Sequence, residues 1–125
     1  MLVVHGLTKS YAGPRPRAVF AEVDLSLARG DYVAIMGESG AGKSTLLNLI
    51  AGLASSDRGS IPLDGTELTT LDDDALTALR RESFGFVFQA FHVLPYLTVA
   101  QNVALPLSLL GVVAPEKDAR VTSVL

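Results

Sequence analysis

The feature that most constrains this chain is a run of eight residues, Gly37-Glu38-Ser39-Gly40-Ala41-Gly42-Lys43-Ser44. It fits the pattern G-x-x-x-x-G-K-[ST] without a gap or a substitution. Glycines permit backbone turns that a Cβ would forbid, so successive N–H groups can point inward and surround a chain of phosphates. The lysine adds a positive charge for the terminal phosphates, and the serine offers a hydroxyl to Mg²⁺. The run therefore predicts a phosphate-binding loop, with Thr45 directly after it.

The sequence on both sides of this loop agrees with that interpretation. Residues 32–36 form a short and almost wholly apolar run, which is typical of a buried parallel strand. Residues 45–51 have a helix-forming composition, and Gly52 stands where a glycine ends many helices. We therefore expect a strand, the loop and then a helix that begins near Lys43. Free N–H groups and the helix dipole favour phosphate at such a helix N-terminus.

The N-terminal part of the chain indicates antiparallel strands. Residues 2–7 have the composition of a strand, and residues 23–27 alternate between apolar and polar side chains. The segment 9–17 between them is rich in proline and glycine, which predicts a loop. Residues 60–65 indicate a short strand that ends in an Asp-Gly turn. Pro62 lacks an N–H group, so we expect this strand at the edge of a sheet.

The second half of the chain indicates helices and one more buried strand. A helix is predicted over residues 71–81, with aspartates at its start and arginines at its end that complement the helix dipole. Residues 84–88 are a second candidate for a buried strand, followed by Gln89. Residues 98–110 favour a mostly apolar helix that Pro106 would kink or interrupt.

Composition excludes several classes of protein. With 125 residues, 49% hydrophobic and 18% charged, the chain suits one globular domain. Its net charge of −3, without a run of lysine or arginine, gives no indication of nucleic-acid binding. The absence of cysteine excludes disulfides and thiolate metal sites and fits the cytoplasm. We expect neither a signal peptide nor a membrane-spanning helix, because polar residues and prolines interrupt the apolar stretch 93–114.

These blocks, in this order, resemble the ATP-binding subunit of ABC transporters. The similarity is carried by residues 30–53, 59–65, 84–89, 94–95 and 98–103, and it covers almost the whole chain. Within the family, the motifs after residue 88 are similar to the branch that serves lipoprotein release and macrolide export. The resemblance implies an α/β P-loop NTPase fold of the ABC type. Its parts would be an antiparallel N-terminal sheet, core parallel strands with the P-loop helix, and the start of a helical subdomain.

The resemblance also implies roles for individual residues. Tyr11 takes the place of the aromatic residue that stacks on adenine, although a solvent-facing loop tyrosine is the alternative. Gln89 takes the place of the glutamine that touches Mg²⁺ or the attacking water, although a polar residue ending a strand is the alternative. Mg²⁺ would be held by Ser44 and Gln89. The residues implied to bind ATP are Tyr11, Gly37, Glu38, Ser39, Gly40, Ala41, Gly42, Lys43, Ser44, Thr45 and Gln89.

The partners that the resemblance implies are ATP, a transmembrane permease and a second ATP-binding subunit. Such a subunit couples ATP binding and hydrolysis to the export or release of a substrate. It would lie in the cytoplasm, on the inner face of the cell membrane, attached through the permease.

The sequence departs from the family pattern in three places. The signature Leu-Ser-Gly-Gly-Gln is absent, no strand ending in Asp-Glu follows Gln89, and no histidine follows His92. We therefore expect residues 1–125 to be a partial ATP-binding domain, from the P-loop through Gln89, without a complete catalytic set. Phosphoryl transfer requires the phosphates, the metal and the water all to be positioned. Such a chain would bind ATP but not hydrolyse it.

Two other functions stay open at this point. The chain could be a nucleotide-binding or regulatory module that never hydrolyses ATP, or another P-loop enzyme such as a small-molecule kinase or a GTPase. A GTPase would carry an Asn-Lys-x-Asp run to recognise guanine, and none occurs. The ordered blocks of the resemblance favour the ABC subunit over a kinase.

Overall fold

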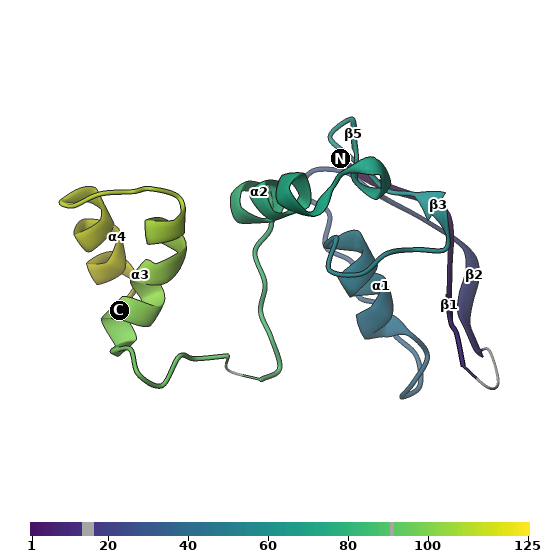
Figure 1. Cartoon of the computed structure of the whole chain (residues 1–125), viewed down its shortest axis with the longest axis horizontal. Coiled ribbons are helices and arrows are strands. Elements are labelled where there is room, and N and C mark those ends of the chain that lie inside the picture. Colours follow the sequence, from purple (N-terminus) through teal and green to yellow (C-terminus); the bar gives the residue numbers. More distant parts are fainter. Residues whose placement is uncertain (14–16, 91) are drawn as a thin grey trace. The chain divides into compact units, whose positions relative to one another are not determined.

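The computed structural model of the chain describes residues 1–13, 17–90 and 92–125. It divides into two compact units, unit 1 (Met1–Leu76) and unit 2 (Thr77–Leu125). Figure 1 labels their elements along the chain. Unit 1 contains the sheet, the P-loop with its helix and the first residues of the helix Asp73–Ser83. Unit 2 contains the rest of that helix, the segment after it and the last two helices of the chain.

The sheet of unit 1 is organised around its first strand. That strand pairs on one side with β2 over its whole length, forming a long hairpin (Figure 1), and on the other side with β3 and β4. The order across the sheet is β2-β1-β4-β5, with β3 also beside β1. The strands are β1 (Leu2–Tyr11), β2 (Arg17–Leu27), β3 (Arg58–Ser60), β4 (Pro62–Leu63) and β5 (Thr66–Glu67).

Two sequence expectations about this sheet need correction. The strand predicted at 2–7 runs on to Tyr11, because its backbone finds a partner in β2 up to the pair Tyr11–Arg17. The predicted loop 9–17 is therefore shorter, and its residues 14–16 lie outside the described residues. The strand containing Pro62 is not at the edge, since β4 lies between β1 and β5. Strand β4 is only two residues long and pairs with β1 through Leu63. The missing N–H of Pro62 therefore costs the sheet few hydrogen bonds.

The parallel core strands expected at 32–36 and 84–88 are not formed. Every strand pair among the described residues is antiparallel, and neither segment takes part in one. Tyr32 and Met36 are 97% and 88% exposed, although the pattern predicted burial. A strand needs a neighbouring backbone to accept and donate its hydrogen bonds, and the described residues provide none for these two segments. The rings of Phe84, Phe86 and Phe88 still stack at every second residue, as on an extended backbone.

The predicted helices are present. Helix α1 begins at Lys43, as expected, and ends in a hydrogen-bonded C-cap in which Gly52 has a φ of 63° and the N–H of Leu53 donates to Asn48. The aspartates and arginines predicted at the two ends of α2 occupy its first and last turns. Helix α3 continues past Pro106. The helices are α1 (Lys43–Ile50), the 3₁₀ helix η1 (Leu68–Thr70), α2 (Asp73–Ser83), α3 (Val99–Leu109) and α4 (Glu116–Val124).

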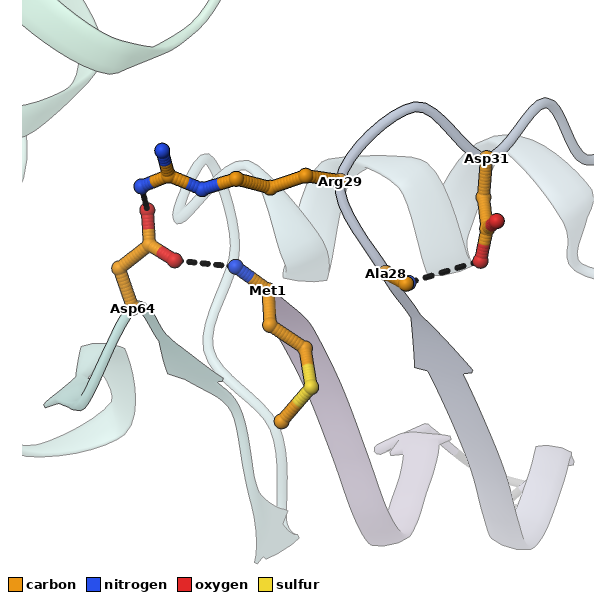
Figure 2. Close-up of polar contacts among 5 residues, drawn as sticks. All are labelled: Met1, Ala28, Arg29, Asp31 and Asp64. Carbon is orange, nitrogen blue, oxygen red and sulfur yellow. Dashed lines mark hydrogen bonds and ion pairs between the residues drawn. The ribbon is translucent and has the colours of Figure 1, made fainter.

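A turn after β2 leads the chain toward the P-loop, and side-chain contacts fix it. Figure 2 shows Asp64 between the ammonium of Met1 and the guanidinium of Arg29, whose Nη2 lies 3.0 Å from Oδ2 of Asp64. Asp31 accepts a hydrogen bond from the N–H of Ala28 at 2.7 Å. The hydrogen bonds from the N-terminus and Arg29 lower the pKa of the Asp64 carboxyl. Through these contacts Met1, just before β1, and Arg29, just after β2, are both bound to Asp64 in the turn between β4 and β5.

The buried core lies in unit 1. Its largest fully buried side chains are on β1, on α1 and next to β3, and no described charged or polar residue is among the buried ones. Unit 2 contributes only Val121 among the described buried residues. The buried apolar residues of unit 1 are Val4, Leu7, Leu46, Leu49, Ile50, Ala51, Ile61 and Leu68.

Candidate functional site

The P-loop takes the conformation that its glycines allow. Gly40 and Gly42 have φ angles of 82° and 89°, in the left-handed region that favours glycine. A Cβ on Gly42 would lie 2.4 Å from Cγ1 of Val19 and 3.2 Å from the ring of Phe20. Strand β2 therefore packs directly against the loop, and only glycine fits at position 42.

The N-terminus of α1 has the properties of an anion site. Its N-cap is Gly42, which offers no side-chain cap, and no acidic residue occupies the first turn. The N–H of Leu46 donates to the Gly42 carbonyl at 2.8 Å. The preceding N–H groups, from Lys43 to Thr45, have no carbonyl four residues back within the helix. They and the helix dipole therefore favour a negatively charged ligand.

The side chain of Lys43 folds back over the loop. Its ammonium donates to the carbonyl of Gly37 at 2.8 Å and to the carbonyl of Glu38 at 2.7 Å. The loop itself is closed by a hydrogen bond from the N–H of Ala41 to the carbonyl of Glu38 at 3.2 Å. An ammonium group has three donors, so one stays available to a ligand while the other two hold the lysine in position.

A cavity of about 440 Å³ joins the P-loop to the end of the β1–β2 hairpin. Tyr11 is part of its wall, so the structure brings together the tyrosine and the loop that the sequence analysis assigned to one ligand. Among the described residues, two cationic side chains line the cavity and no carboxylate does, which favours a polyanion. The lining residues are Tyr11, Arg17, Ala18, Val19, Ser39, Gly40, Gly42, Lys43, Ser44 and Thr45.

The contribution of β2 to this cavity was not predicted from the sequence. Arg17, Ala18 and Val19 line it, and Arg17 lies directly opposite Tyr11 in the β1–β2 ladder. Residues opposite each other in an antiparallel pair place their side chains on the same face. The hairpin was the signal that could have predicted it. If β1 extends to Tyr11, the residue paired with Tyr11 on β2 lies beside it at the site.

The remaining residues predicted to bind ATP fall into two groups. Gly37, Glu38 and Ala41 do not line the cavity but hold the loop and Lys43 through their backbone groups. Gln89 belongs to unit 2, where it is exposed at the end of segment 84–88. Its contact with Mg²⁺ stays a prediction.

Within the described residues, no group of three or more His, Cys, Asp or Glu side chains is placed to hold a metal ion. Ser44 lines the cavity and so could offer its hydroxyl to a metal that arrives with a nucleotide. Among the helices of the described part of the chain, none is both long and apolar enough to cross a membrane.

Comparison with known proteins gives consistent relatives. The family profile described as "ABC transporter" matches residues 20–125. The probable syringafactin export ATP-binding/permease protein SyfD of Pseudomonas syringae pv. tomato is 40% identical over 126 residues, which cover 100% of this chain and 19% of that protein. The macrolide export ATP-binding/permease protein MacB of Neisseria gonorrhoeae is 44% identical over 107 residues, or 86% of this chain and 17% of that protein. The chain thus spans about a fifth of the length of these relatives.

Solved structures agree with the sequence relatives. The dimeric structure of MJ0796, a bacterial ABC transporter cassette, matches with a TM-score of 0.82 and 42% identity, over 87% of this chain and 47% of that one. A post-hydrolysis state of the same cassette, bound to ADP and Pi, matches with a TM-score of 0.88 and 37% identity, over 98% of this chain and 55% of that one. These matches confirm the predicted fold class, and they show that this chain spans about half of a cassette.

Proposed function

This chain belongs to the ABC transporter family, as part of an ATP-binding cassette of the kind found in export systems. We therefore propose that it binds ATP with Mg²⁺ in the cavity between Tyr11 and the P-loop. The observation that carries the proposal is the cavity itself. Its described wall combines an aromatic ring, two cations and a helix N-terminus, and contains no carboxylate.

Each part of the cavity suits one part of the nucleotide. The N–H groups at the start of α1 and the ammonium of Lys43 would hold the β- and γ-phosphates. The hydroxyl of Ser44 would bind Mg²⁺. The ring of Tyr11 would stack on the adenine, which gives affinity whichever way the base's polar edge points.

We further propose that the 125-residue chain binds ATP without turning it over. Catalysis of phosphoryl transfer rests on positioning and on electrostatic stabilisation of the transition state. The printed sequence has no Asp-Glu pair after Gln89 to hold the metal and orient the water. The only acids after residue 89 are Glu116 and Asp118, at the start of α4 in unit 2.

The partners that suit this chain are a transmembrane permease and a second ATP-binding domain. SyfD and MacB are described as ATP-binding/permease proteins of export, and the MJ0796 cassette is described as dimeric. By that likeness the chain would work on the cytoplasmic face of the membrane, attached to a permease, in the export or release of a substrate.

Calorimetric titration with ATP and Mg²⁺, beside an assay of phosphate release, tests the proposal. Wild type should bind ATP weakly and release no phosphate. Lys43→Ala should weaken binding at least tenfold, since a hydrogen bond from a charged group contributes about 1.5–3 kcal/mol. Gln89→Ala should change binding little. Lys117→Ala, which removes the same charge from α4, is the matched control. Equal binding by wild type and Lys43→Ala would contradict the proposed site, and steady turnover that depends on Lys43 would contradict the proposed lack of hydrolysis.

A further inference from the structure

The ring of Tyr11 is covered by a cation from outside the cavity. The ammonium of Lys9 lies 5.4 Å from the centre of the ring, within the range of a cation–π interaction. Tyr11 lines the cavity, whereas Lys9 does not. The side chain of Lys9 is only 16% exposed, which is low for a lysine. Lys9 therefore lies over one face of the ring, while Tyr11 itself is part of the cavity wall.

The ammonium of Lys9 is fixed by the loop that follows α1. It donates to the carbonyl of Ser55 at 2.7 Å and lies 3.6 Å from Oδ1 of Asp57. A lysine with four rotatable bonds loses its freedom only where such partners hold its head group. Lys9 is therefore a fixed support for the ring rather than a mobile surface charge.

Asp57 fastens the same loop to β1. Its Oδ2 accepts hydrogen bonds from the hydroxyl of Ser10 at 2.6 Å and from the N–H of Ser10 at 2.7 Å, and its own N–H donates to the carbonyl of Thr8 at 3.0 Å. The bonds from Ser10 lower the pKa of the Asp57 carboxyl, and Lys9 adds to this effect. The carboxylate therefore stays charged at neutral pH and keeps its hold on both residues.

From these contacts we propose that Lys9 is a positioning residue for the nucleotide base. It holds the ring of Tyr11 in one orientation and covers one face, so that the other face is ready to stack on a base in the cavity. This inference rests on the proposed function, because it assigns a role within the same site.

The arrangement links the two ends of the site through α1. The P-loop lies at the N-terminus of this helix, and the loop that holds Lys9 follows its C-terminus. Both the phosphate-binding and the base-binding parts are therefore attached to one short helix. A ring held in advance costs less conformational entropy when a ligand binds, so loss of Lys9 should weaken base recognition but not phosphate recognition.

The test compares ATP with inorganic tripolyphosphate, which has no base. Lys9→Met should weaken ATP binding about two- to fivefold, the range that a surface cation–π contact supports, and should leave tripolyphosphate binding unchanged. Lys9→Arg should bind ATP like wild type, because a guanidinium can also lie over the ring. Lys117→Met removes one charge from α4 and serves as the matched control. In a Tyr11→Ala background, Lys9→Met should cause no further loss.

Several results would overturn the inference. Equal losses for ATP and tripolyphosphate would show that Lys9 acts through charge or folding rather than through the base. A further loss from Lys9→Met in the Tyr11→Ala background would show that it does not act through the ring. Unchanged ATP binding by Lys9→Met, with normal binding by wild type, would overturn this inference alone. No ATP binding by wild type would overturn the proposed function together with it.

Discussion

The start of strand β1 and the segment 32–36 are both apolar in sequence, but their structures are very different. In β1, Val4 and Leu7 are 1% and 0% exposed, and the strand pairs with β2 on one side and with β3 and β4 on the other. In the segment 32–36, Tyr32 is 97% exposed, and no strand of the described residues pairs with it. The difference lies in the neighbours and not in the strand sequence itself.

This contrast separates two kinds of structural information in the chain. Some elements carry their own signals, such as glycines at sharp turns, caps and charges at helix ends. Other segments have a sequence that suits a strand, but they form one only where a neighbouring backbone pairs with them. MJ0796 matches this chain over 47% to 55% of its own length, so about half of that cassette has no counterpart in this chain.

The largest expected effect is the difference in stability loss between truncating a buried side chain in β1 and an exposed one in the segment 32–36. Leu7→Ala should lower the free energy of unfolding of unit 1 by about 2–5 kcal/mol, because it leaves a cavity in the core. Tyr32→Ala should change it by less than about 0.5 kcal/mol, because that ring is already in water. Urea unfolding followed by circular dichroism measures both.

The paired variants also show how this comparison could fail. If Tyr32→Ala destabilised the chain as much as Leu7→Ala, the segment 32–36 would have to pack against something in solution, for example a second copy of the chain. Measurement at several protein concentrations would reveal such a copy, since its contribution depends on concentration.

The same contrast explains what the sequence could predict. The P-loop, the start of α1 at Lys43 and the positive-φ glycine that follows the C-cap of α1, Gly52, follow from local rules, and all are present. Asp64 and Gly65 both have positive φ angles, as an Asp-Gly hairpin turn requires. The place of Tyr11 beside the P-loop came only from the family resemblance, because no local rule connects residues so far apart.

The missed features have physical reasons too. Arg17 enters the cavity because it faces Tyr11 across the ladder, a contact that depends on register and not on composition. Helix α4 has a polar sequence and only Val121 buried, so it lacks the apolar periodicity that identifies a helix. Its available signal was Pro115 followed by acidic residues in the first turn, a pattern typical of helix starts.

A smaller effect is expected in unit 2, where a helix cap tests how much a local sequence signal contributes to stability. Thr98 caps α3 by accepting the N–H of Gln101 at 3.2 Å, and the side chain of Gln101 accepts the N–H of Thr98 at 2.8 Å. Thr98→Ala should therefore destabilise α3 by about 1 kcal/mol. Thr122→Ala, which removes a threonine from inside α4, is the matched control. Hydrogen exchange of the α3 amides measures the loss, and unchanged protection would show that tertiary contacts rather than the cap hold this helix.

The smallest effect concerns the attachment of β1 to the loop after α1, and it depends on pH. Hydrogen bonds from Ser10 lower the pKa of Asp57 below its ordinary value of 3.8. A carboxyl with a lowered folded pKa stabilises the fold above its unfolded pKa, and this contribution is lost as the pH falls through the folded pKa. The unfolding temperature of wild type should thus be constant near neutral pH and fall below about pH 4.

Asp24, Asp64 and Glu67 also have lowered pKa values and contribute to this loss of stability in acid. Asp57→Asn should therefore reduce the acid dependence without abolishing it, whereas Asp118→Asn, with the same change of charge in unit 2, should leave the unfolding of unit 1 as in wild type. An acid dependence identical in wild type and Asp57→Asn would show that this carboxylate does not help to hold β1 against the loop.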